Sequence, residues 1–127
     1  MTARVSIEDG RLRIHRTGVA RWFGSSVDVP LAHVDSVSAA DPHEVKRWNK
    51  GIRLAGIQLP GLMTSGVYRQ GGQLTWWDVG RGSSALVVTL HEERLTRVIV
   101  EVDDPGVMRE LEQALAAAAL PTEPTVR

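Results

Sequence analysis

Residues 85–120 constrain the fold most, because they join two β-strand patterns to one helix pattern without a break. Ala85–Leu90 and Arg97–Val102 are short runs rich in β-branched residues, and the charged segment His91–Arg94 separates them. Short apolar runs on either side of a polar turn are typical of a β-hairpin. The sequence therefore predicts that a hairpin leads directly into the last helix.

That helix is expected over about residues 105–119. Asp104 can cap it, and Pro105 suits its first turn because a missing N–H costs little there. Apolar residues recur at helical spacing and form one stripe, which consists of Val107, Met108, Leu111, Ala114, Leu115 and Ala118. Because such a stripe needs a β surface to pack on, we expect a mainly β fold with one C-terminal helix.

The length and composition favour one globular domain. The chain has 127 residues, of which 43% are hydrophobic, and this is enough for a real core. We expect a single domain over residues 1–120 and a flexible tail over residues 121–127. The chain starts without a hydrophobic signal core and has no run near the roughly 20 apolar residues of a membrane span, so a cytoplasmic location is expected.

The charge distribution is uneven but weak. Residues 1–53 hold nine Lys/Arg and six Asp/Glu (9 − 6 = +3), and residues 54–127 hold six and nine (6 − 9 = −3). Nucleic-acid binding is not expected, because it needs clustered basic charge. A mild dipole of this kind suits pairing between subunits.

Other short strands are predicted before the closing hairpin. Turn signals at Asp9-Gly10 and Gly71-Gly72 each separate two strand patterns. The strands expected here cover residues 4–8, 11–15, 26–29, 31–37, 66–70 and 73–79. Residues 42–49 read either as one or two helical turns after an Asp41 cap or as an irregular arm. About seven strands would close into a barrel that the C-terminal helix caps, which removes open edges.

No catalytic or cofactor-binding constellation is found in the sequence. The glycines at positions 51, 56, 61, 66 and 71 match no phosphate-binding motif and are interpreted as bends. The four histidines have no metal-ligand spacing, and there is no cysteine. We therefore expect a protein that is not an enzyme and has no catalytic residue, metal site or cofactor.

Four tryptophans are the candidate contact residues. Trp76 and Trp77 must point to opposite faces of a strand, so one fills the barrel and the other must be covered by the neighbouring chain, a partner or solvent. Arg47, Trp48 and Lys50 combine basic charge with an aromatic ring, as interface anchors do. Arg47, Trp48, Lys50 and Trp77 are the predicted partner-binding residues. The alternative is that Trp48 folds back over the barrel.

The chain resembles the small bacterial pleckstrin-homology-like (PH-like) domain proteins over most of residues 4–118. The resemblance rests on the order and spacing of several short segments: Val29-Pro30-Leu31 with Val34 and Val37, Gly56 with Leu59-Pro60-Gly61, Gly66–Arg69, Trp76–Val79, and Val98–Val102 with Asp104-Pro105. It implies a seven-stranded antiparallel barrel or sandwich with a helical cap, no catalytic residues, frequent oligomers and no known ligand. The chain departs from lipid-binding members, because only Glu8-Asp9-Gly10 connects the strands that carry Arg11 and Arg13.

Three functions are compatible with these features. The leading hypothesis is a non-catalytic PH-like module that makes protein contacts or self-associates. The second is a peripheral module on anionic membrane surfaces, using Arg47, Trp48 and Lys50. The third is a small-molecule or enzymatic role in a pocket near Gly61–Tyr68, which needs convergent polar groups and has only Tyr68 and Arg69 nearby.

Overall fold

A computed structural model describes residues 4–15, 26–48, 50–59, 63–80, 84–102 and 106–119 of the chain. The strands in these ranges are β1 (Arg4–Glu8), β2 (Arg11–His15), β3 (Val27–Pro30), β4 (Val34–Ala40), β5 (Ile52–Leu59), β6 (Met63–Gln70), β7 (Gln73–Val79), β8 (Ser84–Leu90) and β9 (Leu95–Val102). The helices are η2 (Leu31–His33, a 3-10 turn), α1 (Pro42–Val45) and α2 (Gly106–Ala119). The predicted Asp104 cap, Pro105 and the tail over 121–127 lie outside the described residues.

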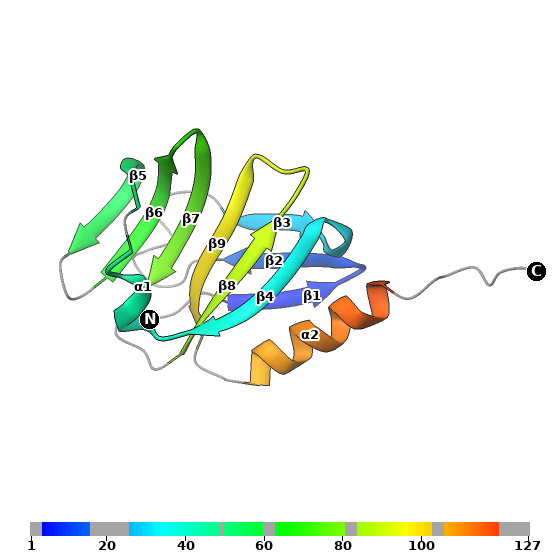
Figure 1. Cartoon of the computed structure of the whole chain (residues 1–127). Helices are drawn as coiled ribbons and strands as arrows, with labels where there is room; N and C mark the ends of the chain where they lie inside the picture. The colour runs from blue at the N-terminus through cyan, green and yellow to red at the C-terminus, as the bar shows by residue number, and fades with distance from the viewer. Residues whose placement is uncertain are drawn as a thin grey trace, which may run out of the picture.

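The strands form two sheets (Figure 1). The small sheet has the order β1-β2-β3, and the large sheet has the order β4-β8-β9-β7-β6-β5. The mainly β class with one C-terminal helix is confirmed, and α2 agrees with the predicted bounds within one residue. The strand number differs, because the described residues form nine strands rather than about seven.

One strand pair also differs from the expected antiparallel arrangement. β7 and β9 pair in parallel, because β8 lies on the far side of β9 and pairs with both β9 and β4. Residues Thr75–Val79 and Val98–Val102 are buried without alternation. Continuous burial is typical of a central strand that is covered on both faces.

Tight turns set the register of two predicted hairpins. Asp9 and Gly10 have φ values of 53° and 73°, and Gly71 and Gly72 have values of 58° and 83°. Two successive residues with positive φ match the twist of a two-residue hairpin. The hairpins predicted around these turns are confirmed as β1–β2 and β6–β7.

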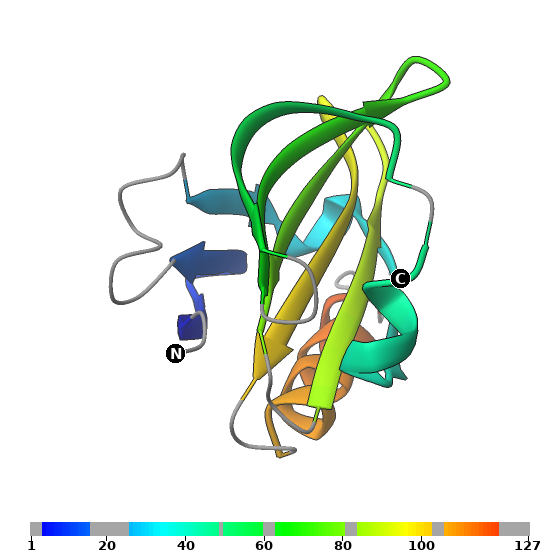
Figure 2. The same ribbon diagram turned by 90° about the vertical axis from the view of Figure 1, so that its left-hand side faces the viewer.

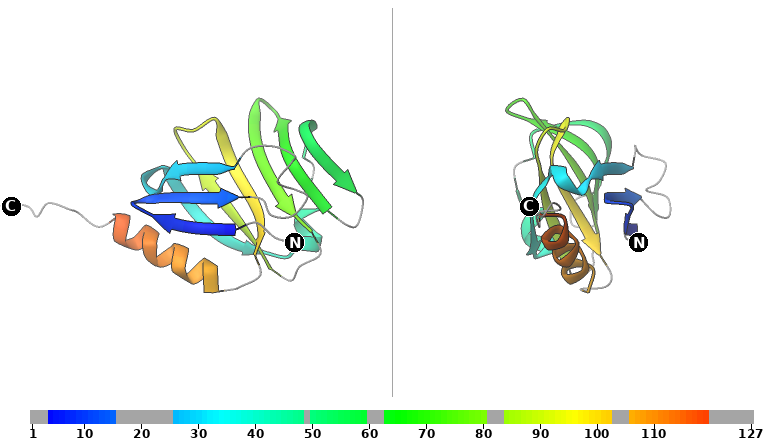
Figure 3. Two further views of the ribbon diagram at one scale, coloured as in Figure 1. Left: turned by 180° about the vertical axis from the view of Figure 1, so that it is seen from behind. Right: turned by 90° about the vertical axis from the view of Figure 1, so that its right-hand side faces the viewer.

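The main core lies between the two sheets and α2. Seen from behind, the small sheet covers the part of the large sheet near β4, β8 and β9, and α2 lies along its lower side (Figure 3). Leu111 of the predicted helical stripe is fully buried, whereas Ala118 is exposed. The core residues with fully buried side chains include Leu12, Ile14, Trp76, Val98, Val100 and Leu111.

A second core covers the opposite face of the large sheet. Figure 2 shows this sheet between the small sheet and α1. The buried residues here are Val45, Tyr68, Trp77, Val79, Val87 and Ile99. α1 is a single helical turn, and the Asp41 side chain caps it by accepting a hydrogen bond from the His43 N–H at 2.9 Å. The sheet therefore has an apolar core on both faces, and Trp76 and Trp77 each belong to one of them.

Candidate interaction surfaces

Trp77, one of the predicted contact residues, belongs to the second core. Its side chain is 2% exposed, and its ring meets those of Trp48 and Tyr68 edge to face, with centroids 6.3 Å apart in each case. The indole Nε1–H donates to Thr75 Oγ1 at 3.0 Å. The expectation that Trp77 offers a face to a partner is corrected, because residues of the same chain already cover the ring.

Lys50 is also turned inward. Its Nζ donates to the carbonyl oxygens of Lys46 at 2.6 Å and Trp48 at 3.2 Å, and it lies 5.0 Å from the centroid of a Trp77 ring. Burial lowers the pKa of the Lys50 ammonium from its ordinary value of 10.5. The Lys50 ammonium is therefore held by Lys46 and Trp48 next to Trp77, and Lys50 has little surface left for a partner.

The remaining two predicted residues reach the surface to different extents. Arg47 is exposed, whereas Trp48 is half-buried against the second core. The guanidinium carbon of Arg97 lies 5.6 Å from the centroid of a Trp48 ring. Trp48 thus folds back over the sheet, which is the alternative that the sequence left open.

The third hypothesis, a pocket near Gly61–Tyr68, is not supported by the geometry of β6. Tyr68 is buried in the second core, whereas Arg69 is exposed, because successive strand residues point to opposite faces. The two side chains do not converge on one ligand. Gly61 lies outside the described residues.

β5 is the surface element that the sequence analysis missed. It forms one edge of the large sheet and pairs with β6 alone. Its side chains Ile52 and Leu54 are 68% and 47% exposed, and they are the large hydrophobic residues that stand out on the surface of the described ranges. An edge strand with exposed apolar side chains is a template for pairing with another chain.

The chain segment around β5 is uniformly basic. Residues 46–77 contain five Lys/Arg and no Asp/Glu. Arg47, Arg53 and Arg69 of this segment are exposed, and Arg53 and Arg69 flank the apolar residues in the register of β5 and β6. A count of charge in windows shorter than half the chain would have shown this segment from the sequence.

β4 forms the opposite edge of the large sheet, and Asp35 is its acidic residue. Residues 22–45 contain four Asp/Glu and no Lys/Arg. β4 lies at this edge, and its exposed residues are Asp35, Ser36, Ser38 and Ala39. The start of β4 lies against α2, where Val34 and Asp35 line a hollow together with Leu115, Ala116 and Ala118.

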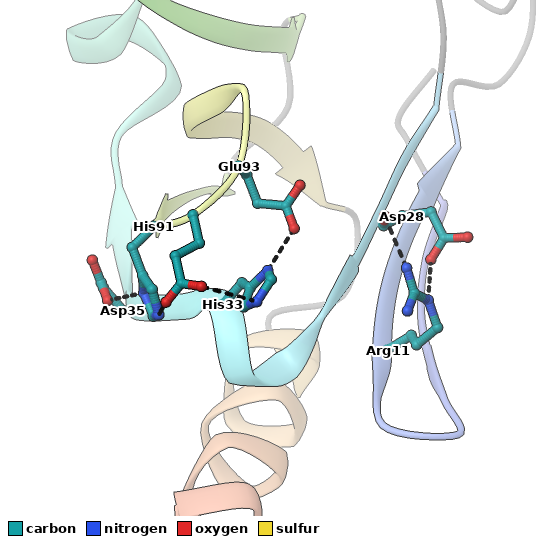
Figure 4. A network of polar contacts seen from close by, with 7 residues as sticks. Arg11, Asp28, His33, Asp35, His91 and Glu93 are labelled. Carbon is teal, nitrogen blue, oxygen red and sulfur yellow. Dashed lines mark hydrogen bonds and ion pairs between the residues drawn. The ribbon is translucent and has the colours of Figure 1, made fainter.

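A histidine–carboxylate network lies at the start of β4 (Figure 4). The His33 Nδ1–H donates to Glu93 at 2.6 Å, and the His91 Nδ1–H donates to Asp35. The centroids of the His33 and His91 rings lie 5.6 Å apart, and the His91 backbone N–H donates to the His33 carbonyl oxygen at 2.9 Å. The network joins the β8–β9 turn to the start of β4, although 57 residues separate the two histidines in sequence (91 − 33 − 1 = 57).

The contacts of this network are hydrogen bonds and ion pairs between side chains of distant segments. Within the described ranges, no set of three His, Asp or Glu side chains is arranged to hold a metal ion. Glu92 adds weaker contacts, with its oxygens 3.9 Å from His33 Nε2 and 3.8 Å from His91 Nε2. The network contributes three carboxylates to the surface near β4.

Arg11 and Arg13, which the sequence comparison with lipid-binding PH domains singled out, are paired with carboxylates within the small sheet. Arg11 Nε lies 2.8 Å from Asp28 Oδ1, and Arg13 lies 3.2 Å from Glu8 and 3.6 Å from Asp28 (Figure 4 shows Arg11 and Asp28). The hydrogen bond from Arg11 lowers the pKa of Asp28 below its ordinary value of 3.8. This face therefore carries paired charges rather than a free basic site.

Comparison of the chain with models of known protein families, with curated proteins and with solved structures finds no match. No helix within the described residues is long and apolar enough to cross a membrane.

Proposed function

We propose that this chain is a non-catalytic, PH-like interaction module that binds another polypeptide by strand addition at the edge of β5. The observation that carries the proposal is the exposure of Ile52 and Leu54 on an edge strand. The module acts in the cytoplasm through contacts alone, without a cofactor.

Strand addition at β5 would use the same interactions that join neighbouring strands within a sheet. An added strand satisfies the outward N–H and C=O groups of β5, and its side chains cover the exposed apolar residues. Full burial of Ile52 or Leu54 would contribute roughly 1.5–3 kcal/mol each. Exposed Arg47 and Arg53 would orient a partner strand that carries acidic residues.

A short peptide provides a direct test. We would titrate the protein with an extended peptide that alternates valine and glutamate, and with a matched peptide that alternates valine and lysine. Binding of the acidic peptide alone is expected. Leu54→Glu should weaken it at least about tenfold, which corresponds to about 1.4 kcal/mol.

The control variant is Ala117→Glu, which places the same charge on an exposed position of α2. It should bind the acidic peptide as the wild type does. Equal binding of both peptides, or equal binding by the wild type and Leu54→Glu, would contradict strand addition at β5.

A membrane surface is the second candidate, and the combination of exposed Ile52 and Leu54 with exposed Arg47 and Arg53 favours it. Basic residues beside apolar ones bind anionic lipid most strongly at low salt. Flotation with vesicles of anionic phospholipid at low salt tests this function. If the wild type floats with the vesicles and Leu54→Glu does not, a membrane surface rather than a polypeptide is the ligand of this site. If the wild type does not float, membrane binding is rejected.

A further inference from the structure

We propose that the groove between β3 and the large sheet binds a small amphipathic anion, which has an apolar body and one carboxylate. The groove has a volume of about 340 Å³, and its walls come from β3, β6, β7, the start of β9 and the β8–β9 turn. Its lining includes Val67, Leu74, Leu95, Asp28, Glu93 and Arg94. This site is separate from the proposed strand addition at β5.

The groove lies on the face of the large sheet that is turned toward the small sheet, opposite Tyr68 and the second core. β3 is an edge of the small sheet, and within the described residues it pairs with β2 alone. The small sheet covers the large sheet near β4, β8 and β9 (Figure 3). Parts of β6 and β7 beyond β3 are therefore left to line a groove at the side of the main core.

The floor of the groove is apolar. Leu74 of β7 is the neighbour of Leu95 of β9 in the strand register, and Val67 of β6 is the neighbour of Trp76. Trp76 is fully buried, whereas the side chains of Val67, Leu74 and Leu95 are half-buried at the groove. These three side chains can support the apolar body of a ligand, because removing apolar surface from water is favourable.

Arg94 supplies the charge that selects an anion. Its side chain is exposed at the groove, and the ion pairs found among the described residues leave it without a carboxylate partner. The two carboxylates of the groove are already engaged. Asp28 Oδ1 accepts a hydrogen bond from Arg11 at 2.8 Å, and Glu93 accepts one from His33 at 2.6 Å. An incoming anion therefore meets one unpaired guanidinium, whereas an incoming cation meets carboxylates that are already hydrogen-bonded.

The size of the groove favours one small molecule over a polypeptide segment. Sites for small molecules usually have volumes of about 300–1,000 Å³, with mostly apolar walls and a few polar groups that fix the orientation. At about 340 Å³ the groove lies at the small end of this range. A guanidinium can bind a carboxylate through two parallel hydrogen bonds. The ligand class is therefore a medium-chain carboxylic acid in its ionised form.

Decanoate, used below its micelle concentration, tests the site together with two matched ligands. Decylammonium has the same apolar body with the opposite charge, and acetate has the same carboxylate without the body. Isothermal titration calorimetry with the full chain should show saturable binding of decanoate and much weaker binding of the other two. In an NMR titration, decanoate should shift the amide resonances of Val27, Val29 and Leu74, which line the groove.

Two variants test the two parts of the groove. Arg94→Glu should weaken decanoate binding at least about tenfold, because it removes a charged hydrogen bond to the ligand. Leu74→Glu should also weaken it, because a carboxylate then lies on the apolar floor, and thermal unfolding shows whether this variant still folds. Arg109→Glu is the control, since it makes the same charge reversal at an exposed position of α2, and it should bind decanoate like the wild type.

Equal affinity for decanoate and decylammonium would overturn the proposal, and so would equal binding of decanoate by the wild type and Arg94→Glu. Amide shifts confined to β5 would place the ligand on the edge strand and would also overturn it. A wild type that binds no decanoate but binds the acidic peptide would overturn the groove site and leave the proposed function intact.

Discussion

Gly56 and Gly66 lie directly opposite each other on β5 and β6, at a distance that excludes a side chain on either residue. A Cβ on Gly66 would lie 2.0 Å from the Ala55 carbonyl oxygen and 2.8 Å from the Gly56 Cα. Both residues have positive φ, 110° for Gly56 and 149° for Gly66. Close backbone contact thus holds the edge strand to the sheet at this point.

Gly66→Ala is expected to disrupt the β5–β6 pairing. The new methyl group collides with backbone that cannot move aside, and overpacking of this kind typically costs about 1–3 kcal/mol in addition to the backbone strain. Gly72→Ala is the control, because Gly72 has a φ of 83° but no atom within 4 Å of an added Cβ. Urea unfolding should show a smaller loss of unfolding free energy for Gly72→Ala than for Gly66→Ala, of about 1–2 kcal/mol. Equal losses in the two variants would contradict the close approach.

Trp77→Ala is expected to lower the free energy of unfolding by about 3–5 kcal/mol, because the ring is buried in the second core. Trp48→Ala should cost less, since Trp48 is half-buried and lies at the edge of that core. Denaturant titration of both variants measures the difference. A Trp77 variant as stable as the wild type would be inconsistent with the observed packing.

Lys50 should make stability rise with pH in the alkaline range. Burial lowers its pKa in the folded state below 10.5, so between the two pKa values the unfolded chain binds a proton that the folded chain has released. Stability therefore increases with pH across that window. Lys50→Met should remove the increase when unfolding is measured at several alkaline pH values, whereas Arg47→Met, at an exposed position, should keep it. A slope that persists in Lys50→Met would refute this assignment.

Asp28 should likewise make stability rise with pH, in the acidic range. Its pKa is lowered in the folded state, mainly by the hydrogen bond from Arg11, so its contribution to stability is present above pH 3.8. The contribution is lost as the pH falls from 3.8 through the lowered value, because in this window the unfolded chain binds a proton that the folded chain does not. When unfolding is measured at several acidic pH values, the stability of Asp28→Asn should fall less over this range than that of the wild type. Glu112→Gln, on the exposed side of α2, is the control and should follow the wild type.

Local sequence signals predicted the elements whose structure depends on neighbouring residues. The Asp9-Gly10 and Gly71-Gly72 turns, the apolar runs of β8 and β9 and the Leu111 stripe of α2 are all present as expected. Turn chemistry and apolar periodicity are properties of short segments, so a sequence is enough to identify them. β5 was missed because Gly56 interrupts its pattern, and the reason for that glycine is its contact with Gly66 on another strand.

Only the tertiary structure decided which side chains remain available at the surface. The sequence placed Trp76 and Trp77 on opposite faces of one strand, but the folding of Trp48 and Lys50 over the second face is what buries Trp77. The same holds for His33 and His91, which come together through the pairing of β4 with β8. The order of the strands likewise places β4 with Asp35 and β5 with Arg53 at the two opposite edges of one sheet. Burial and edge position depend on contacts between distant segments, and for that reason local patterns could not determine them.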